Sequence, residues 1–257
     1  MRILMVTALA FFPVLDTALA ADMDARPLAP MIAASPYTWS GAYFGGNVGF
    51  GWGRSVDTST LNTGGPSLFS DTQSSNMNGI VGGGQIGYNY QNGYWVEGLE
   101  ADFQATSQRS THSFTCPAGI CSAAAVPATL NQEPNWFGTF RGRIGFAPLE
   151  RLLLYATGGL AYGQVDSTST LAGTNRTSDI NAGWTAGAGI EALVAENWTV
   201  RVEYLHVDLG KVSDVFTSTV PSTGTPMLIS NFNSRVTDNI VRAAVNYKFN
   251  WPIIPKY

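Results

Sequence analysis

Charged residues are scarce in this sequence. Asp, Glu, Lys and Arg make up 12% of the 257 residues, whereas a soluble domain carries about 25%. The net charge is −4, and no acidic or basic tail is present, so the sequence offers no basic surface for nucleic acid. We therefore expect no nucleic-acid partner, and the composition differs from that of an ordinary soluble domain.

Histidine and cysteine are also rare. The two histidines, His112 and His206, are far apart, and neither has the spacing to cysteines or carboxylates that a metal site needs. A Ser-His-acid lipase is conceivable, but such a triad is defined by geometry rather than by sequence. The stretches GGNVGFG and VGGGQIG lead into no helix and lack the lysine of a phosphate-binding loop. We expect no enzyme, no metal and no cofactor.

Long apolar runs are missing as well. Beyond residue 20, no stretch reaches the roughly 18 apolar residues of a transmembrane helix. The first 20 residues have the form of a secretory signal, with Arg2, an apolar run and the motif Ala18-Leu19-Ala20. An uncleaved anchor helix is the alternative, which the short run and Pro13 disfavour. We predict a signal peptide over residues 1–20, cleaved after Ala20.

The sequence is rich in alternation with a period of two. In NWFGTFRGRIGFAP, residues 135–148, Phe140 and Ile144 lie on one face, and Thr139, Arg141 and Arg143 on the other. This period is typical of a strand with one apolar and one polar face. Eight strands follow the pattern, over residues 40–53, 77–90, 94–106, 135–148, 152–165, 182–193, 198–207 and 239–249.

The connections between these strands alternate in length. Three are short, around residues 91–93, 148–150 and 195–197. Four are long and rich in Ser, Thr, Asn and Gly, over residues 54–76, 108–132, 166–178 and 213–235. Short turns at one end and long loops at the other are typical of an outer-membrane barrel.

The polar face of the strands carries a nearly balanced set of charges. Its members are Glu100, Asp102, Arg141, Arg143, Glu191, Arg201, Glu203 and Arg242. A basic side chain facing lipid at the bilayer midplane costs about 2–4 kcal/mol, so we place these charges inside a closed barrel and the apolar face outside. They form either a structural ion-pair network or a polar path for small solutes. The network is favoured because about eight strands leave room only for side chains.

Aromatic residues cluster at the strand ends, as expected for rings at the two membrane interfaces. Those at the long-loop end are Trp52, Trp136, Tyr162, Trp184 and Tyr204. Those at the short-turn end are Tyr90, Trp95, Phe146, Trp198, Tyr247 and Phe249. His206 falls on the lipid side near the outer interface, where an interfacial polar role is expected. The sequence therefore predicts an all-β, eight-stranded antiparallel transmembrane barrel.

Several motifs resemble the outer-membrane immunogenic, opacity-type proteins of alphaproteobacteria. They are WSGAYFGGNVGFGWG, GGGQIGYNYQNGYWVEGLEADFQ, GTFRGRIGFAP, LLYATGGLAYG and NIVRAAVNYKF. The resemblance covers nearly the whole mature chain and implies an OmpA-like barrel in the outer membrane of a Gram-negative bacterium. It implies lipid, lipopolysaccharide and the barrel-assembly machinery as partners. Family members are described as porin-like, structural, adhesive or, in some branches, haemin-binding.

The domain boundaries follow from these observations. Residues 21–39 are rich in Pro and Ala and are expected to form an extended periplasmic lead, residues 40–249 the barrel, and residues 250–257 a periplasmic tail. The tail departs from the family pattern, which ends at the aromatic corresponding to Phe249, and Pro252 and Pro255 cannot extend a strand ladder.

The motif CPAGIC places Cys116 and Cys121 in one outward loop of an exported chain. We predict a local disulfide, because the compartment is oxidising. A metal site is the weaker alternative, since no second Cys or His pair accompanies them.

The function expected from the sequence is a structural, surface-exposed barrel whose lumen is filled by the charged set. The alternatives are a binding module, with haemin or a host surface held by the long loops, and a narrow porin-like solute channel.

Overall fold

The computed structural model describes residues 37–62, 65–116, 118, 125–170, 175–218 and 228–249. The predicted signal peptide, most of the predicted lead, the tail over residues 250–257 and Cys121 lie outside the described residues. The described residues form no helix long and apolar enough to cross a membrane.

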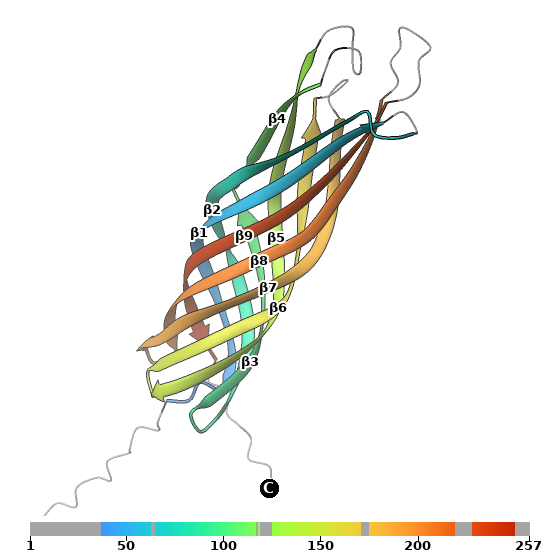
Figure 1. Cartoon of the computed structure of the whole chain (residues 1–257). Coiled ribbons are helices and arrows are strands. Elements are labelled where there is room, and N and C mark those ends of the chain that lie inside the picture. The colour runs from blue at the N-terminus through green and yellow to red at the C-terminus, as the bar shows by residue number, and fades with distance from the viewer. Residues whose placement is uncertain are drawn as a thin grey trace, which may run out of the picture. The chain divides into compact units, whose positions relative to one another are not determined.

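The described chain is built from nine antiparallel strand segments (Figure 1). Their bounds are β1 Gly41–Asn62, β2 Phe69–Asn92, β3 Trp95–Thr106, β4 Ser110–Cys116, β5 Val126–Leu149, β6 Leu152–Ser169, β7 Asn175–Ala195, β8 Trp198–Ser218 and β9 Leu228–Lys248. The sheet closes on itself, because β1 pairs with β9 and β3 pairs with β5. Closure leaves no unpaired edge in the part of the barrel that β3 spans, as a strand structure in lipid requires.

The predicted eight-stranded barrel is confirmed, with β3 and β4 sharing one place in the ring. Both segments pair with β5, and residues 107–109 interrupt them. At this break the Ser107 amide donates to the Ile80 carbonyl at 3.0 Å, so the chain stays attached to β2.

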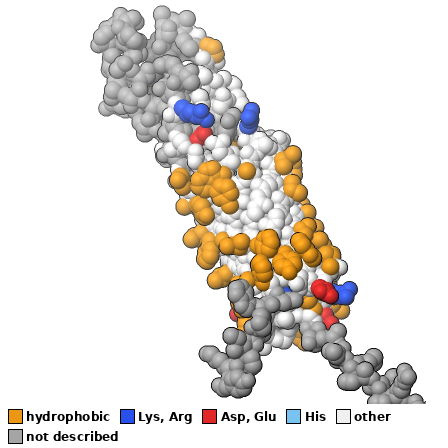
Figure 2. Space-filling model, turned by 180° about the vertical axis from the view of Figure 1, so that it is seen from behind, with side chains coloured by type: hydrophobic (Ala, Val, Ile, Leu, Met, Phe, Trp, Pro, Cys, Tyr) orange, Lys and Arg blue, Asp and Glu red, His pale blue; other side chains and the backbone are white. Residues whose placement is uncertain are grey.

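Side-chain exposure alternates along the strands in the predicted sense. Ile86 and Leu160 on the outer face are 64% and 65% exposed, whereas Arg141 on the inner face is fully buried. Apolar side chains gather in a band around the barrel (Figure 2). An apolar exterior of this kind is stable in lipid and would aggregate in water.

Aromatic rings contact one another across neighbouring strands at both ends of this band. At the long-loop end, Trp52 and Tyr204 lie 6.4 Å apart between ring centroids, and Trp136 and Tyr162 lie 6.2 Å apart. At the short-turn end, Trp198 contacts Tyr247 at 5.1 Å, and further contacts join Trp95 to Phe146 and Phe44 to Phe249. The two rings of aromatics mark the membrane interfaces.

The strands extend further than the sequence predicted at the long-loop end. Residues 54–76 were expected to be a loop, yet β1 continues to Asn62 and β2 begins at Phe69, and the other long connections are shortened in the same way. These segments are rich in Ser and Thr on both faces, so they lack the apolar alternation that identifies a strand in sequence. Backbone ladders and polar contacts hold them, including a 2.8 Å hydrogen bond between Ser55 Oγ and Ser234 Oγ.

The short turns lie where the sequence placed them. Gly93 adopts a φ of 61° between β2 and β3, a left-handed conformation that glycine tolerates best. Residues 150–151 join β5 to β6, and residues 196–197 join β7 to β8.

Candidate functional site: the layered lumen

The inner face of the barrel carries the only extensive set of buried charges within the described residues. The structure places all eight predicted lumen residues inside the barrel, each at most 5% exposed. They lie on β3, β5, β7, β8 and β9, and alternation along each strand directs them inward. Every one of them takes part in at least one ion pair.

The ion pairs cross the lumen instead of lining its wall. Arg141 on β5 reaches Glu203 on β8 at 3.1 Å, and Arg242 on β9 reaches Asp102 on β3 at 2.9 Å. In each case the two strands are three places apart in the ring of eight. Side chains that meet from such distant strands occupy the centre of the barrel.

Glu100 is the most heavily shared carboxylate. It accepts hydrogen bonds from Arg141 and from both terminal nitrogens of Arg201, one of them at 2.9 Å. Tyr43 Oη donates to Glu100 Oε2 at 2.6 Å. Buried charges are tolerated when they are paired and hydrogen-bonded in this way.

A second group centres on Arg143 and Glu191. Arg143 Nη2 lies 2.9 Å from Glu191 Oε2, and its guanidinium stacks 4.0 Å from the centroid of the Tyr155 ring. Thr199 and Asn246 donate to Glu191 at 2.5 and 3.0 Å. This group joins the central ion pairs to the periplasmic side of the lumen.

The predicted lumen network did not include the inward tyrosines. Tyr43 and Tyr155 donate to Glu100 and Glu203 at 2.6 and 2.9 Å. Each ring lies over an inward glycine of the wall, because a Cβ on Gly87 would come within 2.4 Å of Tyr43, and one on Gly189 within 2.5 Å of Tyr155. The glycines thus provide space that the tyrosines fill, and their inward parity was the available signal.

An apolar layer lies on the periplasmic side of the lumen. Trp39, Val96 and Leu153 are at most 1% exposed and pack with Ala147 and Tyr155. The expected extended lead therefore needs correction at its end, since Trp39 packs inside the barrel mouth.

Polar contacts fix this end of the lead. The Trp39 amide donates to Gln91 Oε1 at 2.7 Å, and the Gln91 amide donates to Ser40 Oγ at 2.8 Å. Lys248 Nζ donates to the Thr38 carbonyl and lies 4.3 Å from the centroid of the Tyr37 ring. Side chains of β2 and β9 thus hold the end of the lead in place.

A second apolar layer lies on the outer side of the charges. It contains Met77, Val81, Phe137, Ala161, Val165, Leu205, Val207, Leu209, Val236 and Ile240. Leu205 is the inward residue next to Glu203 on β8, and Ile240 is the inward residue next to Arg242 on β9. Both lie on the long-loop side of the charged residue. Several buried polar side chains share this level, among them Gln104, the cross-strand partner of Phe137, and the pair Gln108 and Asp238, hydrogen-bonded at 2.9 Å. The charged layer is therefore enclosed between two largely apolar layers.

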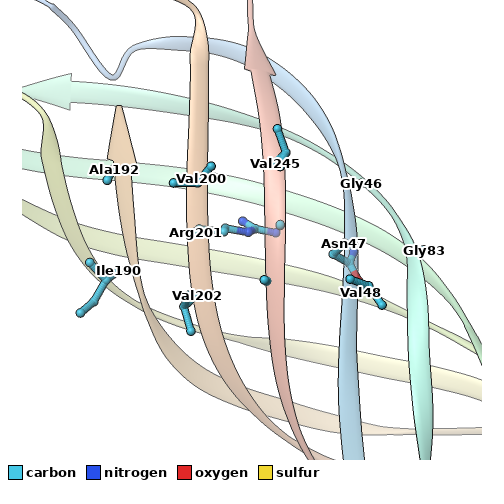
Figure 3. A pocket seen from close by; sticks show the side chains of 12 residues that line it. Gly46, Asn47, Val48, Gly83, Ile190, Ala192, Val200, Arg201, Val202 and Val245 are labelled. Carbon is cyan, nitrogen blue, oxygen red and sulfur yellow. The ribbon is translucent and has the colours of Figure 1, made fainter. Parts of the chain in front are cut away.

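The outer surface has a shallow depression of about 760 Å³ across β7, β8, β9 and β1 (Figure 3). Its rim carries Ile190, Val200, Val202 and Val245, and Ala243 lies within it. All of these side chains belong to the outward, apolar face. The lining also includes Asn47, Gly83 and Arg201, which belong to the inward face of β1, β2 and β8.

The remaining predicted positions fall outside the lumen. His206 lies on the outer face, with its Nδ1 2.9 Å from Asn239 Oδ1 and its ring 5.3 Å from that of Trp184. The side chains of His112 and Cys116, like all of Cys121, are outside the described part of the structure, and so is the predicted disulfide. Within the described part, no group of His, Cys, Asp and Glu could hold a metal ion.

Known proteins similar to this chain are outer-membrane proteins. The family model described as outer membrane protein beta-barrel domain matches residues 25–249. The 31 kDa outer-membrane immunogenic protein of Brucella melitensis is 36% identical over 91% of this chain and 94% of its own length. The 25 kDa outer-membrane immunogenic protein of Brucella abortus is 28% identical over 97% of this chain and 99% of its own length.

Solved structures similar to this chain are more distant. OprG of Pseudomonas aeruginosa aligns with 82% of this chain and 97% of its own, at 14% identity and a TM-score of 0.42. The family match and the Brucella relatives confirm the resemblance seen in the sequence and the location in the outer membrane of a Gram-negative bacterium. The chain therefore belongs to the family of outer membrane proteins with a beta-barrel domain.

Proposed function

We propose that this protein is a closed structural barrel that displays strand ribbons at the cell surface and does not pass solutes. The observation that carries the proposal is the layered lumen, with paired charges between two apolar layers. A small solute would have to separate ion pairs and also cross both apolar layers.

The energetics favour a closed lumen. Four arginines face four carboxylates, so the charged layer is balanced within itself. Removing one partner from a buried ion pair costs about 3–5 kcal/mol. A solute that separated such a pair would therefore meet a substantial barrier. Apolar constrictions add a barrier of their own, because they expel water.

Surface display is the second part of the proposal. Extended β1, β2, β8 and β9 carry the chain beyond the outer ring of aromatics. The relatives are named immunogenic proteins, which fits a segment that antibodies reach from outside the cell. A barrel anchored by lipid contacts and closed inside would serve as a rigid support for these ribbons.

A liposome-swelling assay tests the closed lumen. We expect vesicles containing the purified monomer to exclude small sugars and amino acids at the rate of protein-free vesicles. A trimeric porin reconstituted at the same protein content serves as the positive control. Swelling that rises with the amount of this protein and falls with solute size would support the solute-channel alternative.

A labelling experiment tests the display. In a Cys116→Ser/Cys121→Ser background, Thr72→Cys on the β2 ribbon should react with a membrane-impermeant maleimide on intact cells. Glu196→Cys in the short turn should react only after the outer membrane is opened. The reverse pattern would contradict the orientation.

A further inference from the structure

Exposed charges are sorted between the two ends of the barrel. At the extracellular end, the described exposed charged side chains are all basic: Arg54, Arg109, Arg176, Lys211 and Arg235. At the short-turn end they are mostly acidic: Glu97, Glu150, Arg151 and Glu196. Basic side chains are visible just above the apolar band (Figure 2). The outer interface of the barrel is therefore positively charged.

Three of these basic residues form a patch on adjacent strands. Lys211 on β8 is the direct cross-strand partner of Arg235 on β9. Arg54 on β1 pairs with Thr237, two residues from Arg235. Direct partners have Cβ atoms about 5 Å apart, and diagonal neighbours lie about 7–8 Å apart. We call Arg54, Lys211 and Arg235 the phosphate patch. The patch is compact enough for its three side chains to contact one anionic group.

The depth of the patch matches that of lipid headgroups. Arg54 follows Trp52 by one outward position, and Trp52 contacts Tyr204 in the outer aromatic ring. Such rings sit at the level of the headgroups. Arg54 and Arg235 alternate in phase with the lipid-facing residues below them on β1 and β9. On β8 a register shift between Asp208 and Lys211 turns the exposed Lys211 to the same face, opposite Arg235. All three side chains therefore face away from the lumen.

The patch carries more positive charge than its neighbours neutralise. Asp208 pairs with Arg235 at 2.6 Å, and that carboxylate is nearly buried. Among the described residues, neither Arg54 nor Lys211 has a carboxylate partner. Like charges placed directly opposite each other on paired strands are destabilising, so an external anion would relieve the repulsion between Lys211 and Arg235.

We propose that Arg54, Lys211 and Arg235 bind the phosphate groups of the phosphorylated glycolipid in the outer leaflet. Guanidinium groups recognise phosphate through paired hydrogen bonds, and a lysine adds a point charge. The proposal rests on the outer-membrane location and is independent of whether the lumen is closed. A glycolipid phosphate bound to the patch would hold the barrel at a fixed depth in the membrane.

The test uses barrel refolded into phosphatidylcholine vesicles that contain increasing fractions of bisphosphorylated lipid A. A chelator is present, so that divalent cations cannot replace the basic side chains. The unfolding temperature, read from heat-dependent gel mobility, should rise with the lipid A fraction. The variant Arg54→Gln/Lys211→Gln/Arg235→Gln should need roughly tenfold or more lipid A for half of the effect, because each basic residue contributes to binding at an anionic surface.

Two controls make the assignment specific. Arg151→Gln, at the opposite end of the barrel, should respond to lipid A as the wild type does. Lipid A stripped of phosphate should give no rise in the unfolding temperature. If the triple variant does not refold, the single changes Arg54→Gln and Lys211→Gln should each require several-fold more lipid A.

Four outcomes would overturn the proposal. They are an equal lipid A response in the wild type and the patch variants, an equal response to phosphate-free lipid A, a full response to inorganic phosphate alone, and a response to heparin without one to lipid A. The last would assign the patch to a sulfated polysaccharide. None of these readouts depends on conductance, so the closed lumen and the phosphate patch stand or fall separately.

Discussion

At the residue scale, Arg143 links the charged layer to the rings beside it. It pairs with Glu191 at 2.9 Å, donates to Tyr43 Oη at 3.0 Å and stacks on Tyr155. Its distance to Glu100 is longer, at 3.9 Å. Glu191 is therefore the carboxylate that depends on Arg143 most directly.

The change Arg143→Ala should lower the free energy of unfolding by about 3–5 kcal/mol, because it leaves Glu191 buried and without its ion-pair partner. The measurement is thermal unfolding in detergent. Adding Glu191→Gln should recover part of the loss, and Arg151→Ala in the exposed turn should have no effect. A barrel of unchanged stability with Arg143→Ala alone would refute the coupled network.

The two cysteines allow a separate prediction. A disulfide between Cys116 and Cys121 would close a very short loop, and such closures constrain the unfolded chain little. Protein isolated from membranes without reductant should therefore resist alkylation until it is reduced, and Cys116→Ser/Cys121→Ser should unfold at nearly the wild-type temperature. Two thiols that react freely before reduction would exclude the disulfide.

At the element scale, the end of the lead behaves as part of the barrel. Trp39 is 1% exposed, and its amide donates to Gln91 on β2, while the carbonyl of the preceding Thr38 accepts from Lys248 on β9. Replacing a buried tryptophan with alanine costs about 3–5 kcal/mol. Trp39→Ala should lower the unfolding temperature. It should also let aqueous quenchers reach the fluorescence of the lumen tyrosines Tyr43 and Tyr155.

The matched control for Trp39 is Trp52→Ala, which removes an outward ring of the aromatic belt and leaves the lumen closed. We expect that variant to keep the wild-type quenching of the two tyrosines. Equal stability and equal quenching of Trp39→Ala and wild type would mean that the lead does not seal the mouth.

The extensions of the strands make a prediction about backbone protection. Asp57 on β1 is paired on both sides, with Gln73 on β2 and Ser234 on β9. Its amide should exchange with deuterium far more slowly than the amides of residues 65–68, which lie in the connection between β1 and β2. Hydrogen exchange measured by mass spectrometry tests this prediction. Equal rates in the two segments would support the loop that the sequence predicted over residues 54–76.

At the scale of the whole molecule, lipid and lumen impose opposite demands on the two faces of each strand. That is why alternation along eight segments, together with the loop lengths, predicted the barrel, and why charges such as Arg141 and Arg143 were predicted to point inward. Alternation assigns a face but no partner, however. It could not show that Arg141 reaches Glu203 across the lumen, or that Phe137, Leu205 and Ile240 would meet as an apolar layer.

Two further features escaped the sequence for physical reasons. Trp39 lies in a Pro- and Ala-rich segment with no period, so nothing in the sequence distinguishes a buried anchor from an exposed ring. The ribbons above the membrane carry Ser and Thr on both faces, and strands without a lipid-facing side have no apolar alternation to detect. Tertiary contacts alone reveal both.

The measurement that tests the closed lumen most directly is single-channel recording of the monomeric protein in planar bilayers. The layered lumen predicts no current, or small and rare openings, for the wild type, and more frequent openings when Trp39→Ala removes the periplasmic layer. Barrels with open aqueous channels typically need about 16–18 strands, twice the number here. Large, stable conductance steps of porin size from a monomeric preparation would contradict the closed lumen.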